Sequence, residues 1–165
     1  MAASVFHVGM TVHDLDQAIA FFTDAFGMEV VHTQLQDNEY SRRLVGEPEA
    51  KFRITQLAFT DGPRPRSGHV IELICYDSPE LGELALRNPQ PGAMHLAFLV
   101  TDMDDVFSRV LRHGAVPLSE PVDITAGINA GGRACYVKGP SGITIELLQR
   151  PHAPADQPVT ADAVN

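Results

Sequence analysis

The chain repeats one pattern of predicted elements twice, and this repeat restricts the folds that are open to it. Aligning His7 with His95, which lie 95 − 7 = 88 positions apart, places residues 8–16 over residues 96–104. Each copy reads as an apolar strand, then Asp-hydrophobe-Asp, then apolar residues at helical spacing. An Asp at this place can cap a helix by accepting hydrogen bonds from its first amide groups. We therefore predict a strand followed by a helix at the start of both halves.

Three strand-like segments follow the predicted helix in each half. They span residues 28–35, 51–60 and 68–76 in the first half, and residues 115–118, 132–138 and 143–149 in the second. We predict an α+β fold of two tandem βαβββ modules, residues 1–87 and 92–150, followed by a loose tail at 151–165. Two prolines and a glycine at 88–92 mark the joint between the modules.

Four polar side chains interrupt the apolar strands of the repeat. His7 and His95 lie in the first apolar strand of each half, and Glu72 and Glu146 lie within the last strand. Burying a carboxylate costs free energy unless a partner compensates its charge, and here this occurs twice. Two imidazoles and two carboxylates are natural ligands of one divalent metal ion.

Composition argues against several other roles. The 165 residues carry 12 basic and 21 acidic side chains, a formal net charge of −9, which disfavours binding to nucleic acid or to anionic membranes. We find no run of about 18 apolar residues and no signal-peptide pattern, so we expect a cytoplasmic protein. Cys75 and Cys135 lie in separate apolar runs and are interpreted as buried free thiols.

The repeat, the opening residues 7–22 and the closing Gly139-Pro140-Ser141-Gly142 with Glu146 resemble the vicinal oxygen chelate superfamily. That superfamily includes glyoxalase I, methylmalonyl-CoA epimerase, extradiol dioxygenases and the bleomycin resistance proteins. The resemblance implies a curved sheet of eight strands around a metal-binding cavity and a homodimer. It also implies that His7, Glu72, His95 and Glu146 meet around one Ni, Co, Zn, Mn or Fe ion. Whether one chain or two would supply these ligands is left open.

The resemblance further implies proton transfer next to a carbonyl that a metal ion chelates, as in a lyase or isomerase. By likeness to glyoxalase I, Glu146 is the better candidate for the base, with Glu72 acting on the other face of the substrate. Bacterial glyoxalase I enzymes usually have an arginine on the second strand that helps to hold glutathione, whereas this chain has His32 near that place. We therefore do not expect the usual glutathione adduct as substrate.

Two other functions remain as alternatives. Extradiol dioxygenases place a tyrosine ten residues before the final glutamate, and Tyr136 stands at that spacing because 146 − 136 = 10. Glu72 argues against ring cleavage, since a fourth protein ligand would occupy a position that oxygen needs. A non-catalytic sequestering protein of the bleomycin-resistance type would leave the four polar residues without a role.

Further residues are candidates for contact with substrate. His32 has apolar strand neighbours and could face the cavity, and Tyr136 precedes Glu146 at the spacing noted above. Residues 38–46 form a longer connection than a hairpin needs, and such insertions often cover active sites. Arg42 or Arg43 in this insertion could receive a substrate carboxylate through two hydrogen bonds.

Overall fold

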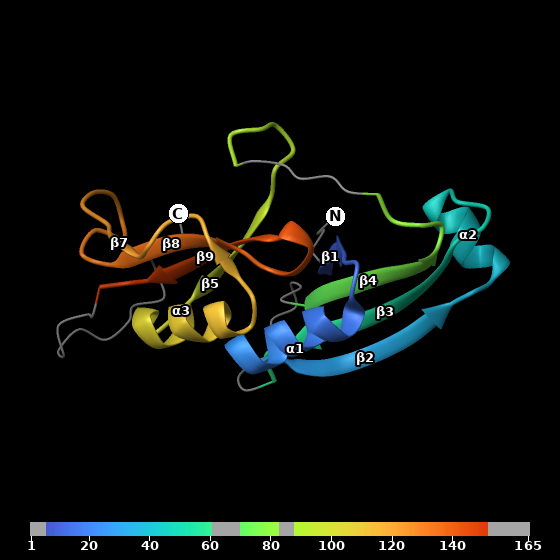
Figure 1. The fold of residues 1–165 in the computed structure, drawn as a ribbon, viewed down its shortest axis with the longest axis horizontal. Coiled ribbons are helices and arrows are strands. Elements are labelled where there is room, and N and C mark those ends of the chain that lie inside the picture. The colour runs from blue at the N-terminus through green and yellow to red at the C-terminus, as the bar shows by residue number, and fades with distance from the viewer. Residues whose placement is uncertain (1–5, 61–69, 83–87, 152–165) are drawn as a thin grey trace, which may run out of the picture.

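The computed structural model describes residues 6–60, 70–82 and 88–151, so the predicted tail at 152–165 lies outside the described residues. Two similar groups of elements follow one another along the chain (Figure 1). The first group contains β1 (His7–Thr11), α1 (Leu15–Phe26), β2 (Glu29–Gln36), α2 (Glu39–Val45), β3 (Lys51–Ala58) and β4 (Val70–Ser78). The second contains β5 (His95–Leu99), α3 (Met103–Arg112), β6 (Val116–Pro117), β7 (Val122–Asp123), β8 (Arg133–Lys138) and β9 (Thr144–Gln149).

The helices begin where the aspartates of the repeat predict. The Asp14 carboxylate accepts a hydrogen bond from the backbone N–H of Gln17 at the start of α1. Asp102 does the same for the backbone N–H of Asp105 at the start of α3. Helix α1 ends at Gly27, whose φ of 73° lies in the left-handed region that glycine adopts without steric cost. The repeated sequence therefore produces a repeated strand and helix, as we predicted.

The strands form two sheets, and the prediction of a single eight-stranded sheet is wrong in this respect. The first sheet has the order β1-β4-β3-β2, and the second has the order β5-β9-β8-β6 with β7 also paired to β8. Among the described residues, β1 and β5 each pair on one side only, so no ladder joins the two sheets. The strand predicted at 115–118 is the short β6, whereas β7 was not predicted. Pro117 and Pro121 have no amide hydrogen to donate, which limits strand pairing in this segment.

The core lies between the helices and one face of each sheet. Phe21 and Phe22 of α1 are fully buried, and Phe26 stacks on Phe98 of β5 with ring centroids 4.0 Å apart. Helices α1 and α3 contact each other, and Figure 1 shows them next to one another on the same side of the molecule. Neither α1 nor α3 covers the opposite face of either sheet, which we call the open face.

Two smaller expectations can also be checked. Cys75 and Cys135 are buried and free, as predicted. Residues 38–46, which we interpreted as a long connection, contain the short helix α2, because Asn38 and Ser41 form a reciprocal capping box at its start. Within residues 6–60, 70–82 and 88–151, no helix is long and apolar enough to span a membrane.

Candidate metal centre

The first predicted histidine and glutamate lie side by side on the open face of the first sheet. Strand β1 runs parallel to β4, and Gly9 is the neighbour of Glu72, so His7 projects from the same face one pair further along. The Nε2 atom of His7 lies 3.5 Å from Oε1 of Glu72. Only 11% of the Glu72 side chain is exposed. A carboxylate this deeply buried requires polar partners.

Gln56 supplies one of those partners. It lies opposite Glu72 on β3, and its side-chain Nε2 donates a hydrogen bond of 2.7 Å to Oε2 of Glu72. The two carboxylate oxygens therefore face different neighbours, His7 on one side and Gln56 on the other. Gln56 was not predicted from the sequence, because its contact with Glu72 depends on the register of β3 against β4. The strand itself gave no signal, because β3 also carries Lys51, Arg53 and Thr55.

The second sheet repeats this arrangement with a different neighbour. Ala97 of β5 pairs with Glu146 of β9, and the Nε2 atom of His95 lies 3.2 Å from Oε2 of Glu146. Tyr136 of β8 pairs with Glu146 from the other side, and its hydroxyl donates a hydrogen bond of 3.2 Å to the same Oε2. Tyr136 therefore holds the place in the second sheet that Gln56 holds in the first.

The environment of Tyr136 keeps its hydroxyl protonated. Burial raises the pKa of Tyr136 above its ordinary value, and the negative charge of Glu146 raises the pKa of this phenol further. At neutral pH the phenol is consequently a hydrogen-bond donor toward the carboxylate. The ring of Tyr136 also lies edge-on to the imidazole of His95, with centroids 5.5 Å apart. Tyr136 thus contacts both polar residues of the second sheet.

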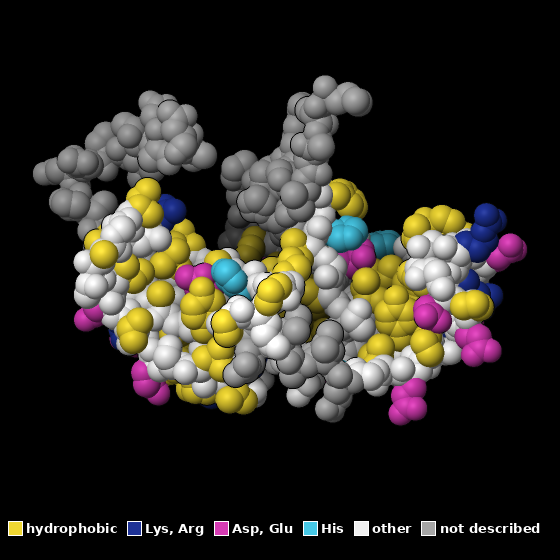
Figure 2. Space-filling model, turned by 90° about the horizontal axis from the view of Figure 1, so that it is seen from above, with side chains coloured by type: hydrophobic (Ala, Val, Ile, Leu, Met, Phe, Trp, Pro, Cys, Tyr) yellow, Lys and Arg dark blue, Asp and Glu magenta, His cyan; other side chains and the backbone are white. Residues whose placement is uncertain are grey.

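The structure brings the four candidate ligands together as two pairs. Among the described residues, no group of three or more His, Cys, Asp or Glu side chains could hold a metal ion. Figure 2 shows a histidine beside an acidic side chain at two separated places, one on each half of the surface that faces the viewer. We refer to His7 with Glu72 as the first half-site and to His95 with Glu146 as the second half-site.

Each half-site has the spacing of two adjacent metal ligands. Two atoms that each lie about 2.1 Å from one ion, at a right angle, are about 3 Å apart. The N–O separations of 3.5 Å and 3.2 Å are close to that value, and they lie beyond and at the upper end of the usual range for an N–H···O hydrogen bond. Imidazole nitrogen with carboxylate oxygen suits a divalent transition metal. Nε2 of His7 is the ring nitrogen that faces the carboxylate of Glu72. In the part of the chain that the structure describes, the other ring nitrogen, Nδ1, is buried without a hydrogen-bond partner.

His32 lies on the same face of the first sheet as Glu72. It is paired with Gln56, which is paired with Glu72, so two strand spacings, or about 10 Å, separate His32 from the carboxylate. The Nε2 atom of His32 lies 3.3 Å from the side-chain oxygen of Gln34. This position is consistent with contact to a substrate that extends away from the half-site.

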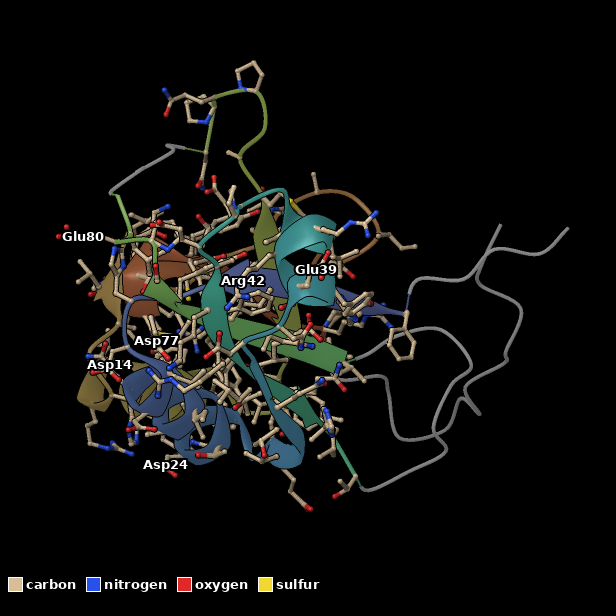
Figure 3. The ribbon with its side chains drawn as sticks, turned by 90° about the vertical axis from the view of Figure 1, so that its right-hand side faces the viewer. Asp14, Asp24, Glu39, Arg42, Asp77 and Glu80 are labelled. Carbon is tan, nitrogen blue, oxygen red and sulfur yellow. The ribbon has the colours of Figure 1, made fainter. Side chains whose placement is uncertain are left out.

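Arg42 and Arg43 lie at the far end of the first sheet. Helix α2 connects β2 to β3 beyond the pair of Gln36 and Phe52, which is about 13 Å along the strand from Gln56. Arg42 forms an ion pair with Asp37, and Figure 3 looks onto this end of the molecule, with Arg42 labelled. Within one chain, α2 therefore does not cover the first half-site.

A cavity of about 250 Å³ lies between the two modules next to the second half-site. It is lined by residues from β1, from the segment that leads into β5, and from the turn before β9. His95, Lys138 and Thr144 give it polar walls, and the amino group of Lys138 donates a hydrogen bond of 2.7 Å to the hydroxyl of Thr144. The surface beside His95 is thus hollowed, with a few polar side chains among mostly apolar walls.

Comparison with known proteins now identifies the class. The sequence profile of the Glyoxalase/Bleomycin resistance protein/Dioxygenase superfamily matches residues 4–147, and the chain belongs to this superfamily. A 2-epi-5-epi-valiolone epimerase from Actinomyces sp. is 36% identical over 94% of this chain and 85% of its own. A lactoylglutathione lyase from Arabidopsis thaliana is 27% identical over 90% of this chain, which spans only 44% of that relative.

The fold agrees with this assignment. The crystal structure of a glyoxalase family protein from Bacillus cereus matches with a TM-score of 0.78 at 27% identity, over 92% of this chain and 96% of the other. The resemblance to the vicinal oxygen chelate superfamily that we inferred from the repeat is therefore confirmed. Relatives of this chain include a named epimerase and a named lyase.

Proposed function

We propose that the protein is a metal-dependent lyase or isomerase that moves a proton next to a chelated carbonyl of a small oxygenated substrate. The observation that carries this proposal is the pair of half-sites, each a histidine nitrogen and a glutamate oxygen at ligand spacing on the open face of its sheet. The superfamily and the two kinds of named relative support the same reaction class. We also propose that the modules are residues 1–87 and 92–150.

The four residues that would hold the ion are His7, Glu72, His95 and Glu146. A divalent ion held by them would draw electron density from two adjacent substrate oxygens and stabilise the negative charge left when the neighbouring carbon loses its proton. The protein's own contribution is to orient that carbon beside a carboxylate oxygen. Within the described residues, Oε1 of Glu146 makes no hydrogen bond, so it is available to accept the proton.

We propose that two copies of the chain complete the site, the first half-site of one copy facing the second half-site of the other. Since one chain holds the half-sites apart, a second copy is the simplest source of the missing ligands. The open face of the second sheet also exposes apolar side chains that a partner would cover. These are Leu99, Val116, Leu118 and Val122, each at least half exposed.

The charge of the open face bears on the substrate class. On the described strands of the first sheet, the row that contains Glu72 continues with Gln56 of β3 and His32 of β2, and neither is a Lys or Arg. On the second sheet Lys138 lines the cavity beside His95, where its amino group donates to the hydroxyl of Thr144. Glutathione and CoA adducts carry anionic groups that cationic side chains usually bind. The amide of Gln56 offers an uncharged donor and acceptor, and the ring nitrogens of His32 can donate or accept, which suits hydroxyl groups. We propose a neutral hydroxy ketone as substrate, in line with the valiolone epimerase among the relatives.

Metal analysis and isotope exchange test this function together. We expect protein purified without chelator to hold about one transition metal ion per chain, and Glu72→Ala and His95→Ala to lose it. His113→Ala is the matched control, because His113 faces Asp24 on α1 rather than a half-site. The wild-type protein should also exchange deuterium at the carbon next to the carbonyl of a hydroxy ketone. Substoichiometric metal in every variant would instead favour a sequestering protein.

One observation favours the alternative of iron-dependent ring cleavage. Tyr136 lies within hydrogen-bond distance of Glu146, in the place that the extradiol spacing predicts. Against it, Glu72 is spaced from His7 as a fourth ligand would be. Oxygen uptake with catechols separates the two reactions. We expect no oxygen uptake, and oxygen consumption at a rate comparable with turnover of the catechol would establish the dioxygenase instead.

A further inference from the structure

Gln56 has a contact that neither the repeat nor the superfamily assignment explains. Its amide donates to Oε2 of Glu72 at 2.7 Å, the shorter of the two hydrogen bonds to the half-site carboxylates. Oε1 of the same carboxylate faces His7. Both oxygens of Glu72 are thus engaged, and the side chain is only 11% exposed. A carboxylate held at both oxygens in a buried position has little freedom to rotate.

Glu146 differs from Glu72 in each of these respects. His95 and Tyr136 both approach the same oxygen, Oε2, each at 3.2 Å. The other oxygen accepts no hydrogen bond from the described residues, and 20% of the side chain is exposed. Glu146 can therefore rotate without breaking a short hydrogen bond, whereas Glu72 cannot.

We infer that Gln56 is a positioning residue that holds Glu72 as a fixed metal ligand and so leaves Glu146 as the mobile carboxylate of the site. This inference rests on the proposed function, because it assigns different roles to two of the four proposed ligands. A neutral amide suits the task, since it can donate a hydrogen bond to the carboxylate while adding no charge to the site. Gln56 does not touch a ligand atom other than Glu72 in the structure.

A double-mutant cycle on metal affinity tests the inference without measuring activity. The variants are Gln56→Met, which keeps the length of the side chain but removes the donor, Glu72→Gln, and the two combined. Gln34→Met is the matched control, because Gln34 lies on the same face but contacts His32 rather than Glu72. Binding of Co²⁺ is followed by calorimetry and by the visible absorption of the ion, and thermal unfolding verifies that each variant is folded.

We expect Gln56→Met to weaken Co²⁺ binding by about 10- to 100-fold and to change the absorption spectrum, as loss of a residue that orients a ligand does. Adding Gln56→Met to Glu72→Gln should cost little more than Glu72→Gln alone, because Gln56 acts through Glu72. Gln34→Met should bind Co²⁺ as the wild type does. If Gln56→Met does not fold, Gln56→Asn is the second variant. It shortens the side chain by one methylene, which moves the amide away from Glu72, and should give the same changes in Co²⁺ binding.

Three outcomes would overturn the inference. Fully additive losses in the cycle would show that Gln56 acts independently of Glu72. Unchanged affinity in a folded Gln56→Met would show that the hydrogen bond does not position the ligand. Failure of the wild-type protein to bind about one Co²⁺ per chain would overturn the proposed function and this inference together, whereas the first two results leave the proposed function intact.

Discussion

The two half-sites occupy equivalent places in the repeat but hold their carboxylates differently. Each has a histidine at the start of the first strand and a glutamate on the neighbouring last strand. Glu72 is buried between His7 and the amide of Gln56, while Glu146 is more exposed and has both neighbours at one oxygen. The repeat therefore supplies four similar ligand positions, and the strand next to the last one in each module, β3 or β8, makes them unequal.

This difference predicts that substitution of the two glutamates has different effects on metal binding and proton exchange. We expect Glu146→Gln to slow proton exchange at the substrate carbon by about 10²- to 10⁴-fold, the usual contribution of a general base, while metal is still bound. Glu72→Gln should instead lose metal affinity first, with exchange recovering at high metal concentration. Parallel titrations of metal binding and deuterium exchange distinguish the two, and identical behaviour of the variants would remove the distinction between the half-sites.

The exposed apolar face of the second sheet gives the next largest effect. Leu118→Asp places a charge where we propose that a second copy packs, so we expect dimer affinity to fall by at least about 100-fold. Sedimentation velocity over a range of concentrations measures this. Ala20→Asp is the control, because Ala20 is exposed on α1, away from the open face. The idea fails if Leu118→Asp sediments as the wild type does, or if both variants dissociate equally.

Tyr136 gives a smaller effect than Gln56 on metal binding. Removing its hydroxyl in Tyr136→Phe takes away one hydrogen bond of 3.2 Å from Glu146 but leaves His95 in place. We expect Co²⁺ affinity to change by less than about threefold and deuterium exchange to slow by about tenfold. A loss of Co²⁺ affinity as large as that of Gln56→Met would show that Tyr136 also fixes its carboxylate.

The smallest predicted effect concerns the core beneath the second half-site. Burial raises the pKa of the Cys135 thiol to about 11, so the folded protein keeps this proton between pH 9 and 11 while the unfolded chain releases it. The free energy of unfolding should therefore fall as the pH rises from 9 to 11, with a slope of at most about 1.4 kcal/mol per pH unit. Urea unfolding of the wild type and Cys135→Ala measures the difference, and equal slopes would contradict the prediction.

The sequence predicted the elements that depend on local pattern and missed those that depend on pairing. Helices α1 and α3 could be predicted from the capping aspartates Asp14 and Asp102 and from the apolar periodicity that follows them. Four polar residues in apolar strands were sufficient to select the candidate ligands. We expected all four to meet at one site, and within one chain they lie in two pairs. Gln56 was missed because only the register of β3 against β4 places it beside Glu72.

The arrangement of the two modules could not be predicted from the sequence either. The repeat indicates that each module has an edge strand, but it does not specify whether β1 and β5 pair with each other or remain apart. For the same reason, the expectation that four ligands meet could not specify the number of chains involved. Helix α2 was missed because a segment of seven residues has too few apolar positions to show a helical period.

A mixed dimer tests the central claim, that one site draws its halves from two copies. One chain carries His7→Ala and Glu72→Ala, the other carries His95→Ala and Glu146→Ala, and the mixed dimer is purified through two different tags. We expect each variant alone to bind no metal. The mixed dimer should bind one ion, half the wild-type content, because one of its two sites has both halves intact. A mixed dimer that holds no metal, while the wild-type dimer holds two ions, would contradict the claim.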